Sequence, residues 1–553
     1  MTLESEEKQM IEDILLKGGY VSEEDLKKAE EFAKNRDASM TEYLLSEEII
    51  SKDILGQAIA EFFKVPYIDL NSNKPSKDQV LKVDEESAKK FRAVLFSEND
   101  QEVVFTTDNP NQPELEIALK NLFKTKKVTI GYSLHEDIDD VLVYYTKSLN
   151  TRFSKIIEEK KSIAPEILEE LFKDAFTFNA SDIHFEPQGE ELIVRFRVDG
   201  VLQEAGRLPI QYYENILNRV KVQSRLRIDE HFAAQDGSMS FETSLGTVNL
   251  RTSIIPTIEG EKIVLRILSS YIKGLTLNDL GLNEADRKIL EEASDKPFGM
   301  ILVVGPTGSG KTTTLYSLIK ILNNPETNIT TIEDPVEYRV RGINQIQVNQ
   351  QTDLTFSKGL RSIVRQDPDI ILVGEIRDEE TAEISINAAL TGHLVLSTFH
   401  ANNASSAVPR LLEMGMEPFL LASTLEVIIA QRLVRRICDT CRFSKNVPKT
   451  ELVKKYKKAG KYFKGTNITL YEGKGCDVCS GTGYKGRIAL FEFIKVTEAV
   501  QQLLLQNPSA NQIWKVAQKE GAQSLFEDGM KKVESGITTI DELVRVAPPT
   551  DDE

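Results

Sequence analysis

The sequence has no segment that could carry it into or across a membrane. No apolar run approaches the ~20 residues that a membrane-spanning helix needs. The acidic stretch from Met1 to Glu7 lacks the basic and then apolar pattern of a secretion signal. We therefore expect a cytoplasmic protein, placed at the inner face of the cytoplasmic membrane only through partners.

Positive charge is also in short supply. Lysine and arginine number 68 against 86 aspartates and glutamates, which gives a formal net charge of −18. Nonspecific affinity for phosphate backbones comes from clustered Lys and Arg, so this balance argues against a protein that coats DNA or RNA. A local basic groove is the remaining alternative. At 553 residues the chain is too long for one core, and we expect three or four domains.

Only four cysteines are present, and they form two Cys-x-x-Cys pairs. In a reducing compartment this pattern favours a metal over disulfides, and four thiolates make a closed tetrahedral zinc site without a catalytic position. An iron–sulfur cluster or redox thiols are the alternatives. Gly475 and Gly481 flank the second pair and suit tight turns. The predicted ligands are Cys438, Cys441, Cys476 and Cys479.

The clearest motif is a phosphate-binding loop with the pattern G-x-x-x-x-G-K-[ST]. Four apolar residues, Ile301 to Val304, precede it as a strand, and helical spacing follows it. Lys311 is predicted to reach the β- and γ-phosphates of a nucleotide and Thr312 to bind magnesium. The predicted phosphate-binding residues are Gly305, Pro306, Thr307, Gly308, Ser309, Gly310, Lys311, Thr312 and Thr313.

Acidic residues follow two other predicted strands. Glu375 follows the apolar run 370–373, with Gly374 where an aspartate is usual, and Glu333 and Glu337 follow residues 330–332. Two acidic strand ends suggest one carboxylate for the metal and another that orients or deprotonates the attacking water. The alternative is that these are solvated loop charges.

Histidines and arginines supply further candidates. His393 and His400 bracket a predicted strand, 394–399, and are either sensors of the γ-phosphate or hydrogen-bonded structural residues. We expect His184 and His231 to be structural. Arginine suits a developing phosphoryl charge because its planar fork stays ionised, although a surface ion pair is the alternative for each one. The candidates are Arg251, Arg266, Arg361, Arg365 and Arg377.

Taken in order, these motifs resemble the secretion ATPase superfamily, in particular the group that drives type II secretion and type IV pilus assembly. The resemblance runs from about Asp174 to Val546. Its segments are Ala180–His184, Arg195–Gly200, Gln235–Gly237, the phosphate loop, Ile332–Glu337 (similar to the Asp box), Arg365–Asp369, Val373–Asp378 (similar to an atypical Walker B segment), Thr391–His400 (similar to the His box), Gln431–Arg435 and Gly483–Arg487.

The resemblance implies a hexamer of RecA-like α/β P-loop domains, each preceded by a small α/β, PAS-like domain that closes over ATP at or near a subunit boundary. It implies that Arg251 and Arg266 reach the phosphates, that Glu337 is the catalytic carboxylate and that Glu375 serves magnesium and water. Arg361, Arg365 and Arg377 become core or interface arginines, and the cysteines match the family's zinc site. Pilus retraction ATPases lack that site, which favours assembly or secretion.

The amino-terminal region is similar to the family's docking domain, so we expect it to bind an inner-membrane platform protein. In some relatives this domain carries Arg-Leu-Gly motifs and binds cyclic di-GMP. Neither Ser39–Tyr43 nor the stretch before Gly19 contains that triplet. We therefore expect no binding of this second messenger.

The predicted organisation has seven parts. They are a helical subdomain (1–64), in which Ser22 and Ser51 cap two similar helices, an α/β subdomain (65–147), a nucleotide-clamp domain (148–273), the ATPase core (286–434), a zinc-binding insert (435–490), a helical region (491–546) and a disordered tail (547–553).

The sequence as a whole predicts a hexameric ATPase motor that uses ATP, Mg²⁺ and Zn²⁺ to assemble a pilus or a secretion pseudopilus. A nucleic-acid translocase, including a DNA-uptake motor of the same superfamily, and a nucleotide-gated scaffold are the alternatives. A pilus, a pseudopilus and a DNA-uptake fibre would use the same motor, and the partner would distinguish them.

Overall fold

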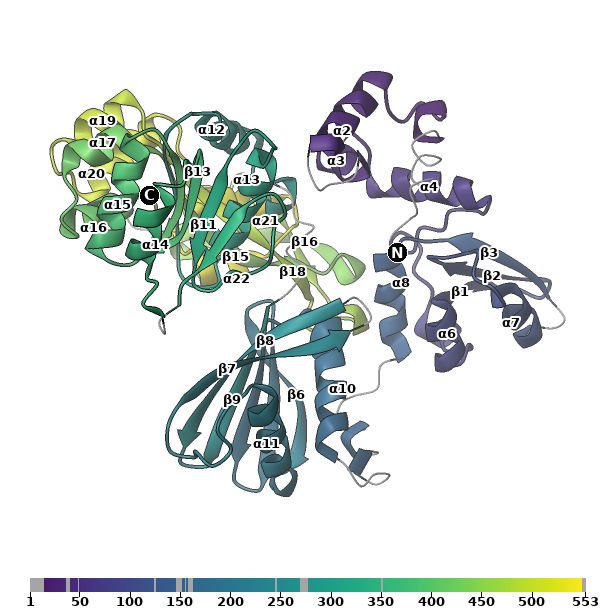
Figure 1. Cartoon of the computed structure of the whole chain (residues 1–553). Coiled ribbons are helices and arrows are strands. Elements are labelled where there is room, and N and C mark those ends of the chain that lie inside the picture. The colour runs from purple at the N-terminus through teal and green to yellow at the C-terminus, as the bar shows by residue number, and fades with distance from the viewer. Residues whose placement is uncertain are drawn as a thin grey trace.

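The computed structural model describes residues 14–35, 40–47, 49–123, 126–145, 152–154, 156–157, 163–243, 246–268, 277–349 and 352–549. Ser39 and the end of the expected tail, residues 550–553, lie outside these ranges. Figure 1 shows the amino-terminal helices and small sheet on one side, a six-stranded unit below, and the large sheet with the carboxyl-terminal helices on the other side. Within the described part of the chain, no helix combines the length and apolarity needed to cross a membrane.

The amino-terminal helices form because capped, amphipathic segments bury one face. Ser22 Oγ accepts from the Asp25 amide at 3.1 Å, and Ser51 Oγ accepts from the Ile54 amide at 3.2 Å. Both expected caps are therefore confirmed. The apolar residues of this helical region, including Leu15, Leu44 and Ala58, pack in one cluster. The helices are α2 Glu23–Asn35, α3 Met40–Ser46 and α4 Lys52–Phe63.

A small α/β unit follows and contains a three-stranded sheet in the order β1-β2-β3. β1 and β2 are antiparallel, whereas β2 and β3 are parallel and joined through a helix. The strands are β1 Ala93–Glu98, β2 Glu102–Thr107 and β3 Lys127–Tyr132. The helices are α5 Lys77–Val80, α6 Glu85–Phe91, α7 Leu115–Leu122, α8 His135–Leu142 and the 3₁₀ turn η1 Val143–Tyr145.

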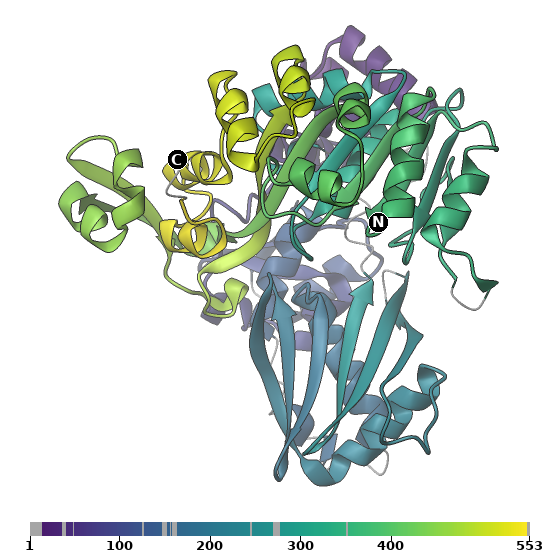
Figure 2. The same ribbon diagram turned by 90° about the vertical axis from the view of Figure 1, so that its left-hand side faces the viewer.

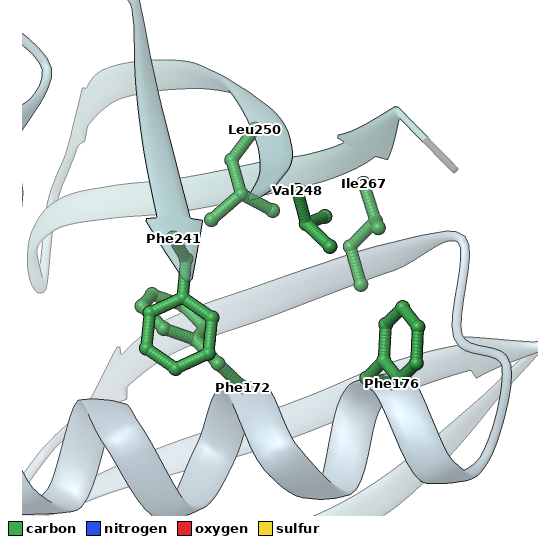
Figure 3. Close-up of a pocket in the computed structure, with 6 residues that line it drawn as sticks. All are labelled: Phe172, Phe176, Phe241, Val248, Leu250 and Ile267. Carbon is green, nitrogen blue, oxygen red and sulfur yellow. The ribbon is translucent and has the colours of Figure 1, made fainter. Parts of the chain in front are cut away.

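The six-stranded unit is a wholly antiparallel sheet in the order β6-β5-β4-β9-β8-β7. Asp199-Gly200 forms the hairpin turn between β5 and β6, as the sequence predicts. The apolar face packs against α10 and α11, and Figure 3 shows Phe172 and Phe176 of α10 facing Phe241 and Ile267 of the sheet. The elements are α10 Ile163–Thr177, β4 Asp182–Gln188, β5 Glu191–Val198, β6 Val201–Pro209, η2 Ile210–Tyr212, α11 Tyr213–Gln223, β7 Gln235–Thr243, β8 Gly246–Thr257 and β9 Gly260–Leu268.

The ATPase core is built on a seven-stranded sheet in the order β12-β11-β13-β14-β10-β15-β18. All neighbouring strands are parallel except β15 and β18. β10 and β14 are buried at every position, as expected for parallel strands covered on both faces. The strands are β10 Gly299–Val304, β11 Ile329–Glu333, β12 Asn344–Gln347, β13 Ile370–Ile376, β14 Leu394–Phe399, β15 Leu425–Ile437 and β18 Tyr484–Lys495.

Helices cover both faces of this sheet, and two apolar clusters separate them from it. Figure 2 shows the carboxyl-terminal helices beside the sheet and the insert projecting away from it. Helix α21 packs against β18 at the sheet edge. The covering helices are η4 Asn278–Leu280, α12 Glu284–Ser294, α13 Lys311–Leu322, α14 Phe356–Ile363, α15 Glu379–Leu390, α16 Ala407–Glu413, α17 Pro418–Thr424, α19 Glu498–Leu504, α20 Ala510–Lys519, α21 Leu525–Glu534 and α22 Ile540–Val546.

The cysteine-bearing insert leaves the sheet at the end of β15 and returns at the start of β18. Its two strands, β16 and β17, form a separate antiparallel pair. Ala547, which we assigned to the disordered tail, is instead buried in the apolar cluster of the carboxyl-terminal helices. The insert contains η6 Asp439–Cys441, β16 Arg442–Pro448, α18 Lys449–Lys455, η7 Lys457–Tyr462, β17 Asn467–Gly473 and η8 Asp477–Cys479.

Candidate nucleotide site and tetracysteine centre

The glycine loop joins the end of β10 to the start of α13, which is the strand–loop–helix arrangement that the pattern requires. Gly305, Gly308 and Gly310 have φ values of 150°, 76° and 88°. A Cβ at Gly305 would lie 2.5 Å from the Gln431 carbonyl oxygen, and one at Gly310 would lie 2.7 Å from Gln431 Nε2. Only glycine satisfies both the backbone angle and the close approach at these positions.

Lys311 is 9% exposed and turns its ammonium group back onto the loop. Its Nζ donates to the carbonyl oxygens of Gly305 and Pro306, each at 3.0 Å. Burial lowers the pKa of Lys311, while the charge of Glu375 acts to raise it. Ser309 Oγ is buried without a hydrogen-bond partner among the described residues. A cation, an unpaired hydroxyl and the amino end of α13 form a cradle that fits a polyphosphate.

Pro306 and Thr307 complete the loop, and Thr312 and Thr313 follow in the first turn of α13, where both are half-buried. Behind the loop, Gln431 is almost fully buried in β15 and accepts from Thr314 Oγ1 at 2.8 Å. Our sequence reasoning gave Gln431 no role. Its position as a polar residue directly after the apolar run Val427–Ala430 could have identified it.

Glu375 lies at the irregular end of β13, where the pairing with β14 shifts between Val373 and Ile376. His400 Nε2 lies 3.4 Å from its Oε2, and Arg377 forms an ion pair with its Oε1. The three predicted residues therefore lie together. They lie on the same edge of the sheet as the phosphate loop, because parallel strands end on one side.

Glu333 is placed differently from the other predicted carboxylates. It is 3% exposed, and both of its oxygens accept from hydroxyl groups, one from Tyr316 and one from Thr331, each at 2.5 Å. Burial raises the pKa of Glu333, and these hydrogen bonds act to lower it. The geometry thus makes Glu333 an anchor for α13, through the otherwise unpredicted Tyr316, rather than an exposed base.

Glu337 lies within electrostatic range of the two predicted arginines of the six-stranded unit. Burial and the charge of Glu333 raise the pKa of Glu337, and the charges of Arg266 and Arg251 act to lower it. Arg251 and Arg266 are directly opposite each other on β8 and β9, so both side chains project from the same face of that sheet. Asp182 Oδ1 accepts from Arg266 Nε at 3.1 Å. The predicted arginines therefore approach the predicted carboxylate within one chain.

The structure does not bring every candidate to this edge. His393 precedes β14 and lies at the opposite end of the sheet, with Nδ1 2.8 Å from the Ala388 carbonyl oxygen, which matches the structural alternative. Arg361 on α14 and Arg365 in the turn that follows it are both exposed, so of the two expected placements, core or interface, the interface remains a prediction for both. Arg361 forms a 2.7 Å ion pair with Glu380. His184 and His231 lie beside Glu186 and Glu261, as expected for structural residues.

The four cysteines converge between two 3₁₀ turns. The sulfur atoms of Cys438 and Cys476, of Cys441 and Cys479, and of Cys476 and Cys479 are 3.8, 3.9 and 3.7 Å apart. Zinc–sulfur bonds of ~2.3 Å in a tetrahedron require sulfur separations of about 3.8 Å, so the donor set fits zinc. Gly475 and Gly481 have φ values of 84° and 78°, which confirms the expected tight turns.

Backbone donors support the same centre. The amides of Cys476 and Gly483 donate to Cys479 Sγ at 3.1 and 3.2 Å. Although burial acts to raise it, these bonds lower the pKa of Cys479 to about 7. Thiolate character and N–H···S bonds are features of structural metal centres.

Comparison with known proteins identifies the chain's family. Residues 157–545 match the model of the Type II/IV secretion system protein family, and residues 63–150 match that of the MshEN domain. The chain belongs to the Type II/IV secretion system protein family. This secretion ATPase is 35% identical to the type IV pilus assembly ATPase PilB of Acinetobacter baylyi, over 96% of this chain and 95% of that protein.

Other similarities agree with this assignment. The secretion ATPase is 43% identical to type II secretion system protein E of Pseudomonas aeruginosa, over 70% of this chain and 76% of that protein. The crystal structure of the Legionella pneumophila ATPase DotB aligns with a TM-score of 0.52 at 22% identity, over 70% of this chain and 96% of that one. This likeness supports the RecA-like fold of the core.

The fit of the cysteines gives a first test of the secretion ATPase. We predict about one zinc ion per chain by metal analysis of the purified, reduced protein. Replacing Cys476 and Cys479 by serine should remove this zinc. The seven-stranded sheet that carries the phosphate loop should stay folded. A folded, reduced protein without zinc, or one with iron and inorganic sulfide instead, would contradict the zinc assignment.

Proposed function

We propose that this protein is a homohexameric motor that hydrolyses ATP to power assembly of a type IV pilus or a type II secretion pseudopilus. The observation that carries this proposal is that Arg251 and Arg266, paired on neighbouring strands of the six-stranded unit, are near enough to Glu337 of the core for their charges to act on its pKa. A nucleotide held between a lobe with carboxylates and a lobe with guanidinium groups couples bond cleavage to the position of the lobes. The named relatives, a pilus assembly ATPase and a secretion protein, agree with such a motor.

In this proposal each side chain has a defined task. Residues 305–313 hold the phosphates of ATP, with Lys311 released from the loop carbonyls to contact them. Magnesium, held at Thr312 and near Glu375, would neutralise phosphate charge. Glu337 orients a water molecule and accepts its proton as the oxygen bonds to the γ-phosphorus and the bond to ADP breaks. Arg377 and His400 hold Glu375, and Glu333 supports α13 rather than the water.

The arginines make the cycle mechanical. Arg251 and Arg266 are drawn toward the charge of the γ-phosphate, and loss of that charge weakens their hold. The six-stranded unit then rotates as a rigid body against the core, which is one of the ways in which packed domains respond to such a change. Six subunits in sequence would pass this rotation to a membrane partner.

The partner in this proposal is a platform protein of the inner membrane. The helical subdomain (1–64) and the α/β subdomain (65–147), which includes most of the MshEN match, would dock to it from the cytoplasm. The six-stranded unit is the nucleotide clamp of the predicted region 148–273, and the insert carries the zinc. Contact with the lipid itself is not required, because the platform supplies the membrane anchor.

The test is to measure ATP turnover of the full-length hexamer with three additions. The cytoplasmic part of a platform protein should stimulate turnover, whereas double-stranded or single-stranded DNA should leave it unchanged. Strong stimulation by DNA alone would replace the assembly motor by a nucleic-acid translocase. Tight ATP binding without turnover under any condition would indicate the nucleotide-gated scaffold.

A further inference from the structure

The segment that leaves the second cysteine pair contacts two other parts of the chain through consecutive residues. Lys485 forms an ion pair with Asp140 of α8, in the amino-terminal α/β unit. The amide of Gly486 donates to Asp199 Oδ2 at 2.8 Å, in the β5–β6 turn of the six-stranded unit. The first contact is made by a side chain and the second by the backbone, so two neighbouring residues hold two different domains.

The cysteine turn itself also contacts the amino-terminal unit. The short turns η1 and η8 pack together, and Lys77 Nζ lies 2.8 Å from Asp477 Oδ2, between the cysteines of the second pair. The ammonium groups of Lys74 and Lys77 lie 5.8 and 6.0 Å from the ring centre of Tyr144. The amino-terminal unit thus presents two cations and an aromatic ring to this turn.

The charges of the two surfaces are complementary. Burial and the charge of Lys485 lower the pKa of Lys74, and the charges of Asp140, Cys476 and Cys438 act to raise it, so these groups interact electrostatically. Four thiolates around one zinc ion carry a net charge of about −2, so nearby lysines suit the metal-bound form of the centre. The cysteine ligands and the lysines therefore come from different domains but belong to one electrostatic cluster.

The six-stranded unit also connects its two arginines near Glu337 with the segment that leaves the second cysteine pair. Asp182, which accepts from Arg266, is paired in register with Arg197 of β5. Arg197 lies two residues before Asp199, the acceptor of the Gly486 amide. Arg266, Asp182 and Arg197 thus form a line of polar contacts that ends two residues before Asp199, the residue that contacts the strand leaving the cysteine centre.

We propose that the second cysteine turn, together with residues 483–487, is a joint that fixes the amino-terminal unit to both the six-stranded unit and the core. Metal bound by the cysteines holds the joint in the shape that Asp140, Lys77 and Asp199 contact. The inference rests on the metal site and not on the motor function. Its consequence is that movement of the six-stranded unit changes the position of the domain that we expect to dock at the membrane.

The first experiment is zero-length carbodiimide cross-linking of the full-length protein, read by mass spectrometry. Two cross-links report the joint, Lys77–Asp477 and Lys485–Asp140. The Lys120–Glu116 pair on α7, with a distance of 2.5 Å, is an internal control far from the cysteines in sequence. Removing zinc with a chelator should abolish both joint cross-links and leave the control unchanged. Unchanged yields at the joint in a metal-free, folded protein would overturn the proposal.

A second arm decides the matter if metal removal unfolds the insert. The Lys77→Glu variant keeps all four cysteines and should retain its zinc. It should lower the Lys485–Asp140 cross-link about two- to fivefold, which is the effect of losing one half-exposed ion pair. Adding Asp477→Lys should restore the yield, whereas Lys120→Glu should have no effect. If the zinc-loaded Lys77→Glu variant gives the same yield of the Lys485–Asp140 cross-link as the wild type, the two contacts are independent. In that case no joint exists.

Discussion

Replacing Lys311 by alanine is expected to lower ATP turnover by at least about 10²- to 10³-fold, the usual loss when one preorganised donor to a developing charge is removed. The ammonium group is already held inside the loop, 3.0 Å from two loop carbonyl oxygens, and needs only to turn toward the phosphates. The substitution leaves every residue of the two apolar clusters in place, so the seven-stranded sheet should remain folded. Turnover is measured by phosphate release at saturating ATP.

The matched control is Lys288→Ala, which removes an exposed lysine from α12 in the same core. It should leave turnover within experimental error. Circular dichroism and the size of the assembled particle check that the Lys311 variant is intact. Wild-type rates from an intact Lys311→Ala preparation, freed of contaminating ATPases, would show that the phosphates bind elsewhere.

Replacing Glu337 by glutamine is expected to lower the maximal rate by about 10²- to 10⁴-fold and to leave ATP binding nearly unchanged. The amide keeps the size of the side chain and removes the base. Binding of a fluorescent ATP analogue separates the two effects. Glu383→Gln, an exposed change on α15, is the matched control. An equal loss of binding and rate would assign Glu337 to nucleotide binding instead.

The pH dependence provides an independent test of the same residue. Burial and the nearby Glu333 raise the pKa of Glu337 above its ordinary value of 4.5. A base must be ionised to accept a proton, so turnover should fall as the pH drops through this raised pKa. Arg266 acts to lower the pKa, and therefore Arg266→Gln should move this acidic limb to higher pH. A limb that stays in place, or moves to lower pH, would exclude Glu337 as the titrating base.

The parts that the sequence predicts well are those written in contiguous residues. The phosphate loop, its strand and its helix lie within about twenty positions, and each local signal agrees with the others. The Asp199-Gly200 hairpin and the two serine caps are similar, because a turn or a cap depends on few neighbours. The two cysteine pairs are also predicted to lie together, because four sulfur ligands complete one metal site.

Other features depend on contacts that no local pattern encodes. The Tyr316 hydroxyl donates to one oxygen of Glu333. This hydrogen bond gives Glu333 a structural role, where the sequence predicted a catalytic one. Asp140 and Asp477 contact their lysines only after the amino-terminal α/β unit has packed against the segment of the second cysteine pair. These pairs combine residues that are far apart in sequence, and either partner alone is an ordinary surface charge.

The two alternatives for His393, a phosphate sensor or a structural residue, could have been distinguished from the sequence itself. The phosphate loop, Glu375 and His400 all follow their strands, whereas His393 precedes its strand. In a parallel sheet only residues after the strands converge on one edge, so a histidine before a strand belongs to the opposite edge. Because His393 precedes strand 394–399 and His400 follows it, the chain direction alone assigns the two histidines to opposite edges of the sheet.

The ends of the seven-stranded sheet bear on how this protein behaves when many copies gather at one place. At one end, β12 is only four residues long, with a polar sequence, Asn-Gln-Ile-Gln, that offers little to an incoming strand. At the other end, α21 covers β18. Because neither edge strand offers a long free edge, the sheets of two copies do not readily pair and aggregate. Contacts between subunits therefore use other surfaces.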